Sequence, residues 1–112
     1  MDALKTILTR RSIRKYKDKK IPKEIIKQLI EAGRQAPSAF NDQPWVFITF
    51  TSQDKKDAIA EHKSQKSKFI QTAPLMIACC YDETKSHTSA HNLENVAVAA
   101  ENILLAAHAL DL

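Results

Sequence analysis

Three arginines and a serine stand within five residues near the start of the chain, in the segment Arg10-Arg11-Ser12-Ile13-Arg14. A guanidinium group can bind a phosphate through two parallel hydrogen bonds, and a hydroxyl adds a neutral donor. In an extended backbone alternate side chains share one side, so Arg10, Ser12 and Arg14 could follow an elongated anion. The segment indicates a phosphate site, although a solvated run of charge would have the same composition.

A second polar cluster lies in residues 36–45, where two prolines restrict the backbone. Asn41 and Gln43 each carry a carboxamide that donates and accepts hydrogen bonds, as recognition of an amide-bearing heterocycle requires. A plain turn that leads into a strand, with Trp45 in the core, explains the same residues. Taken alone, these residues are explained more simply by a turn that leads into a strand.

The composition excludes several classes of function. With one glycine, Gly33, the chain has neither a glycine-rich dinucleotide-binding turn nor a P-loop. The net charge is +4, and eleven of the seventeen Lys and Arg residues lie in residues 1–34, which favours an anionic partner. No RNA- or DNA-binding motif accompanies them, so a nucleic acid is the weaker alternative. The histidines lack metal-ligand spacing except His87 and His91, which straddle an expected loop-to-helix boundary, so we expect no metal site.

The remaining composition is that of a cytoplasmic protein with no membrane partner. Apolar runs are shorter than the roughly 18 residues that span a bilayer, and the first ten residues are amphipathic rather than signal-like. Cys79 and Cys80 are adjacent in an apolar run, so in a strand they would point to opposite faces. We therefore expect free, buried thiols, and no local motif indicates a Ser/His/Asp or Cys/His catalytic set.

The spacing of apolar residues predicts four helices and two strands in a single domain of residues 1–112. Thr51 and Asp54 have the spacing of a capping box that opens the third helix, and Gly33 is expected to end the second. The helices are expected over residues 2–9, 22–33, 52–62 and 91–110, the strands over residues 45–51 and 75–81, and residues 63–72 form a short helix or loop. The second strand is continuously apolar, which is typical of a strand covered on both faces.

The last helix, over residues 91–110, is apolar around most of its circumference. One predicted face collects its larger apolar residues and several alanines, namely Leu93, Val96, Ala97, Ala100, Ile103, Leu104, Ala107 and Leu110. Such a helix is buried, and alanines permit close approach of backbones. Because so short a chain offers little to cover it, we expect a second subunit.

Four motifs in this order resemble the nitroreductase family of FMN-dependent oxidoreductases. They are residues 10–16; Ala36-Pro37-Ser38 with Asn41 and Gln43-Pro44-Trp45; Thr72-Ala73-Pro74 before an apolar strand; and residues 99–110, which look like the family's central interface helix. The resemblance covers nearly the whole chain. It implies an α+β fold, with a small mixed sheet flanked by helices and a long interface helix at the centre of a homodimer.

The resemblance also implies FMN as the cofactor and assigns residues to it. In the family the arginine-serine stretch contacts the phosphate and ribityl chain, which here falls on Arg10, Arg11 and Ser12, while Arg14 could reach the phosphate or the N1–C2=O edge of the ring. The second cluster reaches the flavin from the other subunit, through Pro37, Ser38, Ala39, Asn41 and Gln43. Lys68, six residues before Pro74, resembles a family lysine near the pyrimidine edge.

The activity that the resemblance implies is transfer of hydride from NAD(P)H through the flavin to a nitroaromatic or quinone-type acceptor. The cofactor carries this chemistry, so no catalytic acid or base is demanded. Family members continue past the interface helix through glycine-rich segments, and Asp111 stands where they usually have glycine. The chain is therefore a truncated or minimal member, and the alternative is an inactive dimer scaffold that binds FMN weakly or not at all.

Overall fold

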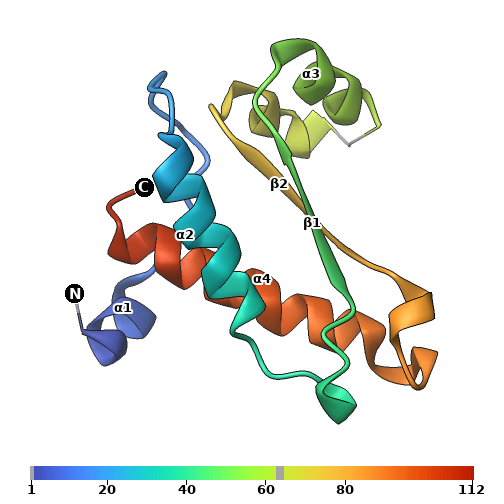
Figure 1. The fold of residues 1–112 in the computed structure, drawn as a ribbon. Helices are drawn as coiled ribbons and strands as arrows, with labels where there is room; N and C mark the ends of the chain where they lie inside the picture. Colours follow the sequence, from blue (N-terminus) through green and yellow to red (C-terminus); the bar gives the residue numbers. More distant parts are fainter. Residues whose placement is uncertain (1, 63–64) are drawn as a thin grey trace.

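The computed structural model describes residues 2–62 and 65–112, which form four helices and one β-ribbon (Figure 1). The expected order of helices and strands is confirmed. The helices are α1 (Ala3–Thr9), α2 (Lys23–Arg34), α3 (Gln53–Glu61) and α4 (Asn92–Ala109), and the strands are β1 (Trp45–Phe50) and β2 (Met76–Tyr81). Four short 3₁₀ turns complete them: η1 (Ala39–Asn41), η2 (Gln65–Thr72), η3 (Glu83–Lys85) and η4 (Ser89–His91). Of the segment expected as a short helix or loop, residues 63 and 64 lie outside the described residues.

The two strands form an antiparallel ribbon in which Trp45 pairs with Tyr81 and Phe50 with Met76. Helix α4 contacts both strands, and α2 packs on α4, so the core lies where these elements meet. It contains Ala36, Trp45 and Ala99, the last fully buried. Trp45 is thus a packing residue, as expected.

The second strand was expected to be covered on both faces, and in this chain it is not. Its residues are half-buried from Met76 to Cys80, and Tyr81 is exposed. The physical reason is that a two-stranded ribbon flanked by so few helices has too little material to cover both faces. Cys79 and Cys80 are free and half-buried, and burial, followed by the nearby Cys80, raises the pKa of the Cys79 thiol.

Gly33 does not end α2, which continues to Arg34. A Cβ at this position would come within 2.9 Å of both Ile103 Cδ1 and Phe47 Cζ. The missing side chain lets α2 approach α4 closely, and Asn102 Nδ2 of α4 donates a hydrogen bond to the Ala32 carbonyl at 3.0 Å. The glycine is therefore explained by packing rather than by helix termination.

In this chain helix α4 buries only part of the predicted apolar face, in which Ile103 is buried and Val96 packs against the core. The buried residues are Asn92, Asn95, Ala99 and Ile103. By contrast, Leu93 is 73% exposed and Leu104 is 51% exposed. The sequence prediction placed only apolar residues inside. Asn92 and Asn95 are buried as well, because each hydrogen-bonds to a neighbouring loop.

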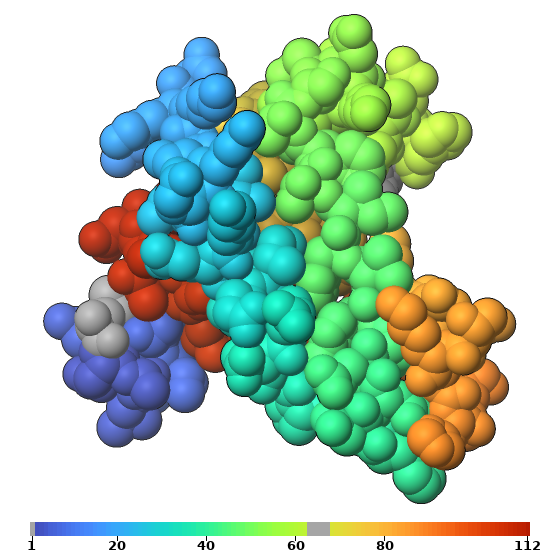
Figure 2. Space-filling model, viewed as in Figure 1, coloured from blue at the N-terminus to red at the C-terminus, as the bar shows by residue number. Residues whose placement is uncertain are grey.

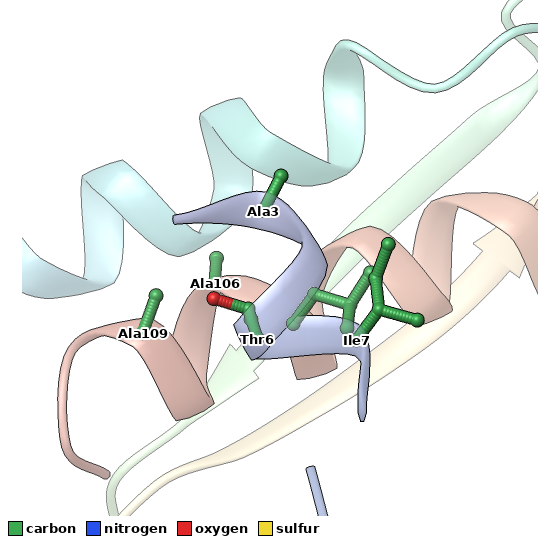
Figure 3. Close-up of a pocket in the computed structure, with 6 residues that line it drawn as sticks. Ala3, Thr6, Ile7, Ala106 and Ala109 are labelled. Carbon is green, nitrogen blue, oxygen red and sulfur yellow. The ribbon is translucent and has the colours of Figure 1, made fainter. Parts of the chain in front are cut away.

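Helix α1 lies across the carboxyl end of α4, and it too leaves apolar side chains in solvent. Thr6 is buried, whereas its neighbours Leu4, Ile7 and Leu8 are exposed. Figure 3 shows a shallow hollow between the two helices, lined by Ala3, Thr6, Ile7, Leu105, Ala106 and Ala109. Among the described residues, none of the helices is long and apolar enough to cross a membrane.

The predicted capping box at the start of α3 is wrong. Ser52, not Thr51, precedes the helix, and its side chain makes no capping hydrogen bond. A tertiary contact fixes the helix instead: the buried Lys56 Nζ donates to the Ala73 carbonyl at 2.7 Å. This bond joins α3 to the turn before β2.

Candidate functional site

The arginine-serine segment begins where α1 ends and is fastened to α4 at that point. Arg10 leaves the helix with extended backbone angles (φ −56°, ψ 138°). Thr9 Oγ1 and His108 Nε2 lie 2.8 Å apart in a hydrogen bond, and Arg10 Nε lies 3.6 Å from Glu101 Oε1. The start of the segment is therefore held by two side chains of α4.

The guanidinium of Arg11 turns back on its own chain. It donates to the carbonyl oxygens of Leu8 at 3.2 Å and Arg10 at 2.9 Å, which satisfies acceptors left free at the end of α1. Of these neighbours, Arg11 and Ser12 are exposed, and Arg10 is half-buried beside Glu101.

Arg14, which the resemblance assigns to the same cofactor as Lys68, lies beside Phe69 in the structure. The Arg14 guanidinium lies 5.9 Å from the centre of the Phe69 ring, and Lys68 is the preceding residue. Tyr16 packs on the same ring with 6.1 Å between ring centres. Burial raises the pKa of Tyr16, and the charge of Arg14 opposes that rise.

The second cluster forms a loop of residues 38–43 with an unusual backbone. Phe40, Asn41 and Gln43 all have left-handed φ angles, of 58°, 54° and 51°. A residue other than glycine in this region costs about 1–3 kcal/mol, so the loop needs anchors to persist. Inside the loop, Ser38 Oγ accepts from the Gln43 amide at 3.0 Å, and Gln43 Nε2 donates to Asn41 Oδ1 at 3.2 Å.

Two further anchors reach the 38–43 loop from outside. Asn95 Oδ1 of α4 accepts a hydrogen bond from the Ala39 amide at 3.0 Å. Asp42 accepts from the His87 amide at 2.7 Å, and its second carboxylate oxygen bonds to His87 Nδ1. With these anchors the loop presents Pro37, Asn41 and Gln43 on the surface, each of them exposed.

One chain does not bring the two clusters together. The arginine-serine segment is fastened to the later part of α4, through Arg10–Glu101 and the preceding Thr9–His108, whereas the 38–43 loop is bonded to Asn95 near the start of that helix. The thirteen-residue step from Asn95 to His108 rises about 20 Å along α4. In the space-filling view (Figure 2) the loop lies at the lower edge, and α1, which the arginine-serine segment follows, lies at the lower left. The two clusters of one chain are therefore separated along α4.

Sequence reasoning did not single out several residues that position these clusters: Phe69, His87, Asn95 and Glu101. Asn95 carried a usable signal, because a polar residue at helical spacing from Asn92, Ala99 and Ile103 marks a buried face with a specific partner. His87 lies 45 positions from Asp42, and no local pattern connects the two.

The chain belongs to the nitroreductase family, whose family model matches residues 7–83. It is 37% identical, over its whole length, to a protein of Methanothermobacter thermautotrophicus provisionally named NADH dehydrogenase/NAD(P)H nitroreductase, and it covers 58% of that protein. A crystal structure from Clostridium acetobutylicum, provisionally named an NADH oxidase, matches 95% of the chain with a TM-score of 0.89 and 45% identity; the chain covers 63% of it.

A crystal structure from Desulfovibrio desulfuricans shows a protein provisionally named a nitroreductase, in complex with FMN. It matches 96% of the chain with a TM-score of 0.87 and 33% identity. The chain covers 62% of that structure. The chain thus spans about three fifths of the length of these three proteins. The α+β fold class inferred from the sequence is confirmed by these matches.

Proposed function

We propose that this chain binds FMN at a site to which two copies contribute, and that the assembled protein transfers hydride from NAD(P)H to a nitroaromatic or quinone-type acceptor. The observation that carries the proposal is the separation of the two clusters along α4, where Arg10 and Thr9 contact Glu101 and His108 while the 38–43 loop contacts Asn95. A flavin that contacts both clusters needs the arginine segment of one copy and the 38–43 loop of the other. The match to the FMN-bound structure from D. desulfuricans supports FMN as the ligand.

The side chains of the first cluster fit the anionic end of FMN. Arg10 contacts Glu101 through Nε in an exposed ion pair, which a phosphate can replace at small cost. Arg10, Arg11 and Ser12 would hold the phosphate and ribityl chain, and Arg14 would place a positive charge at the phosphate or beside the ring. When bound, FMN supplies the chemistry of accepting and donating hydride. A cation beside N1 stabilises the negative charge of the reduced ring.

The second cluster fits the ring. Asn41 and Gln43 carry exposed carboxamides, which match the alternating donors and acceptors of the pyrimidine edge. Pro37, Ser38 and Ala39 would pass beside the ring, and Lys68 of the other copy would add a donor near the same edge. Hydrogen bonds from the loop to Asn95 and His87 would limit its motion before a ligand arrives, so little conformational entropy would be lost on binding.

The proposed dimer uses apolar surface that a single chain leaves exposed. Leu93 and Leu104 of α4 are more than half exposed, as are Leu4, Ile7 and Leu8 of α1. Large exposed apolar side chains gathered on two adjoining helices are typical of an interface. A second copy that covers α4 would also bring its own 38–43 loop toward the arginine segment.

The second candidate function is a folded dimer scaffold that binds FMN weakly or not at all. It is favoured because the chain covers only 58% of the relative from M. thermautotrophicus and 63% of the structure from C. acetobutylicum. The additional segments of those proteins could complete a flavin site. The cytoplasmic location and the lack of nucleic-acid and membrane partners stay predictions.

Two measurements on the purified chain test the proposal. Analytical ultracentrifugation gives the mass of the assembly, and titration with FMN, followed by flavin fluorescence, gives the affinity and the stoichiometry. The proposal expects a dimer that binds FMN and whose flavin absorbance bleaches when NADH or NADPH is added without oxygen. A dimer that leaves FMN free favours the scaffold, and a monomer that binds FMN tightly contradicts the shared site.

A further inference from the structure

The backbone of the 38–43 loop requires restraint from elsewhere in the molecule. Phe40, Asn41 and Gln43 occupy the left-handed region, whereas Asp42 between them is right-handed, with φ −67° and ψ −32°. Residues other than glycine leave such backbone angles for more favourable ones unless surrounding contacts hold them there. The hydrogen bonds between Ser38, Asn41 and Gln43 are local to the loop, and they would move with it.

Asp42 supplies a restraint from outside. Its side chain is 5% exposed, although the loop lies at the surface. Both carboxylate oxygens are used: one accepts from the His87 amide at 2.7 Å, and the other bonds to His87 Nδ1. The backbone hydrogen bond from His87, and then the bond from its side chain, lower the pKa of Asp42, so the carboxylate stays ionised at neutral pH.

His87 connects this bond to the strained residues and to α4. Its ring is stacked on the Phe40 ring, with 5.2 Å between centres and 22° between planes. The preceding Ser86 Oγ donates a hydrogen bond to Asn92 Oδ1 at the start of α4, at 2.5 Å. The Asp42–His87 pair therefore ties the 38–43 loop to the segment that begins α4.

We propose that Asp42 and His87 are positioning residues that hold the 38–43 loop in its ligand-binding conformation before the flavin arrives. The proposal rests on the proposed function, in which Ser38, Asn41 and Gln43 of this loop contact the flavin ring. Asp42 and His87 do not themselves need to touch the ligand. Their substitution should therefore weaken flavin binding through the loop, to the same degree for FMN and for riboflavin.

His87 is the residue to change first, because its side chain is 69% exposed and its substitution should leave the fold intact. His87→Ala removes the side-chain donor and the stack on Phe40. His87→Asn places an amide nitrogen where Nδ1 stood, so it restores the hydrogen bond without the ring. Asp82→Asn is the matched control, because Asp82 also accepts two hydrogen bonds, from the amide and hydroxyl of Thr84, but they close only a local turn.

Hydrogen–deuterium exchange of the amides of residues 39–43 tests the restraint without any flavin. Fluorescence titration with FMN and with riboflavin tests its consequence. For His87→Ala we expect faster exchange in the loop and about tenfold or greater loss of affinity for both flavins, the size expected when a hydrogen bond to a charged group is lost. His87→Asn should recover most of both losses, and Asp82→Asn should match the wild type.

The outcomes separate this inference from the proposed function. Unchanged exchange and unchanged flavin affinity in His87→Ala would overturn the inference while leaving the proposed function standing. Faster exchange with a loss confined to FMN would also overturn it, because the phosphate lies with the other cluster. If the wild-type chain binds neither flavin, the proposed function fails, and the exchange comparison between His87→Ala and His87→Asn still decides whether the pair restrains the loop.

Discussion

Substitution of Arg10 by alanine should separate phosphate recognition from the stability of the fold. In the free chain Arg10 Nε lies 3.6 Å from Glu101 Oε1, and the two side chains are 30% and 50% exposed. An ion pair this exposed contributes about 0–1 kcal/mol, so Arg10→Ala should lower the free energy of unfolding by no more than about 1 kcal/mol. Urea denaturation measures that change.

Binding of FMN should respond far more strongly to the same substitution. Each hydrogen bond between a guanidinium and a phosphate contributes about 1.5–3 kcal/mol, so the loss of one lowers affinity by about tenfold to a few hundredfold. Riboflavin lacks the phosphate and should bind equally well to Arg10→Ala and to the wild type. Fluorescence titrations of both proteins with both ligands give the four dissociation constants.

Glu101→Gln is the matched variant for this experiment. It removes the carboxylate that pairs with Arg10 but keeps the guanidinium and the shape of the side chain. Its affinity for FMN should stay level or rise, because the phosphate no longer competes with Glu101. Equal losses for FMN and riboflavin in Arg10→Ala would refute the assignment of Arg10 to the phosphate.

Three further predictions follow from the packing and the electrostatics. Gly33→Ala should lower the free energy of unfolding by about 1–2 kcal/mol in urea titrations, because the overpacking that its new Cβ causes exceeds the gain in helix propensity. Leu104→Glu should leave the fold of the single chain intact but convert the proposed dimer to a monomer in ultracentrifugation, because a side chain now 51% exposed would become a buried, unpaired charge. Hydrogen bonds lower the pKa of Asp42 and of Asp82 in the folded chain. The two ionised carboxylates therefore contribute their full stability above the ordinary aspartate pKa of about 4. That contribution declines as the pH falls through the lowered pKa values. The urea midpoint of the Asp42→Asn/Asp82→Asn double variant should therefore fall less between pH 6 and pH 3 than that of the wild type.

The elements of the fold were predictable because their apolar residues repeat at regular spacing. Helix α2 and the two strands carry that signal, and their bounds agree with prediction to within one or two residues. The buried face of α4 was not predictable from hydrophobicity alone. It contains Asn92 and Asn95, and the partner of Asn95 is the Ala39 amide, 56 positions away in the sequence.

The candidate site was predictable by residue type but not by conformation. The arginines and the carboxamides of Asn41 and Gln43 are visible in the sequence, yet nothing there indicates left-handed backbone in a loop without glycine. The Asp42–His87 pair depends on tertiary structure across 45 positions, as does the cation–π contact that joins Arg14 to the Lys68 segment. Contacts of this kind are set by packing, which local patterns do not encode.

The central claim is that each flavin site combines the arginine segment of one copy with the 38–43 loop of another, and mixing of two defective variants tests it most directly. One variant carries Arg10→Ala and Arg14→Ala, and the other carries Asn41→Ala and Gln43→Ala. Each alone should form a dimer that retains little FMN. Because a mixed dimer pairs one intact segment with one intact loop, subunit exchange should restore about a quarter of the wild-type FMN sites at wild-type affinity. No recovery after confirmed exchange would place both halves of the site in one chain and contradict the account.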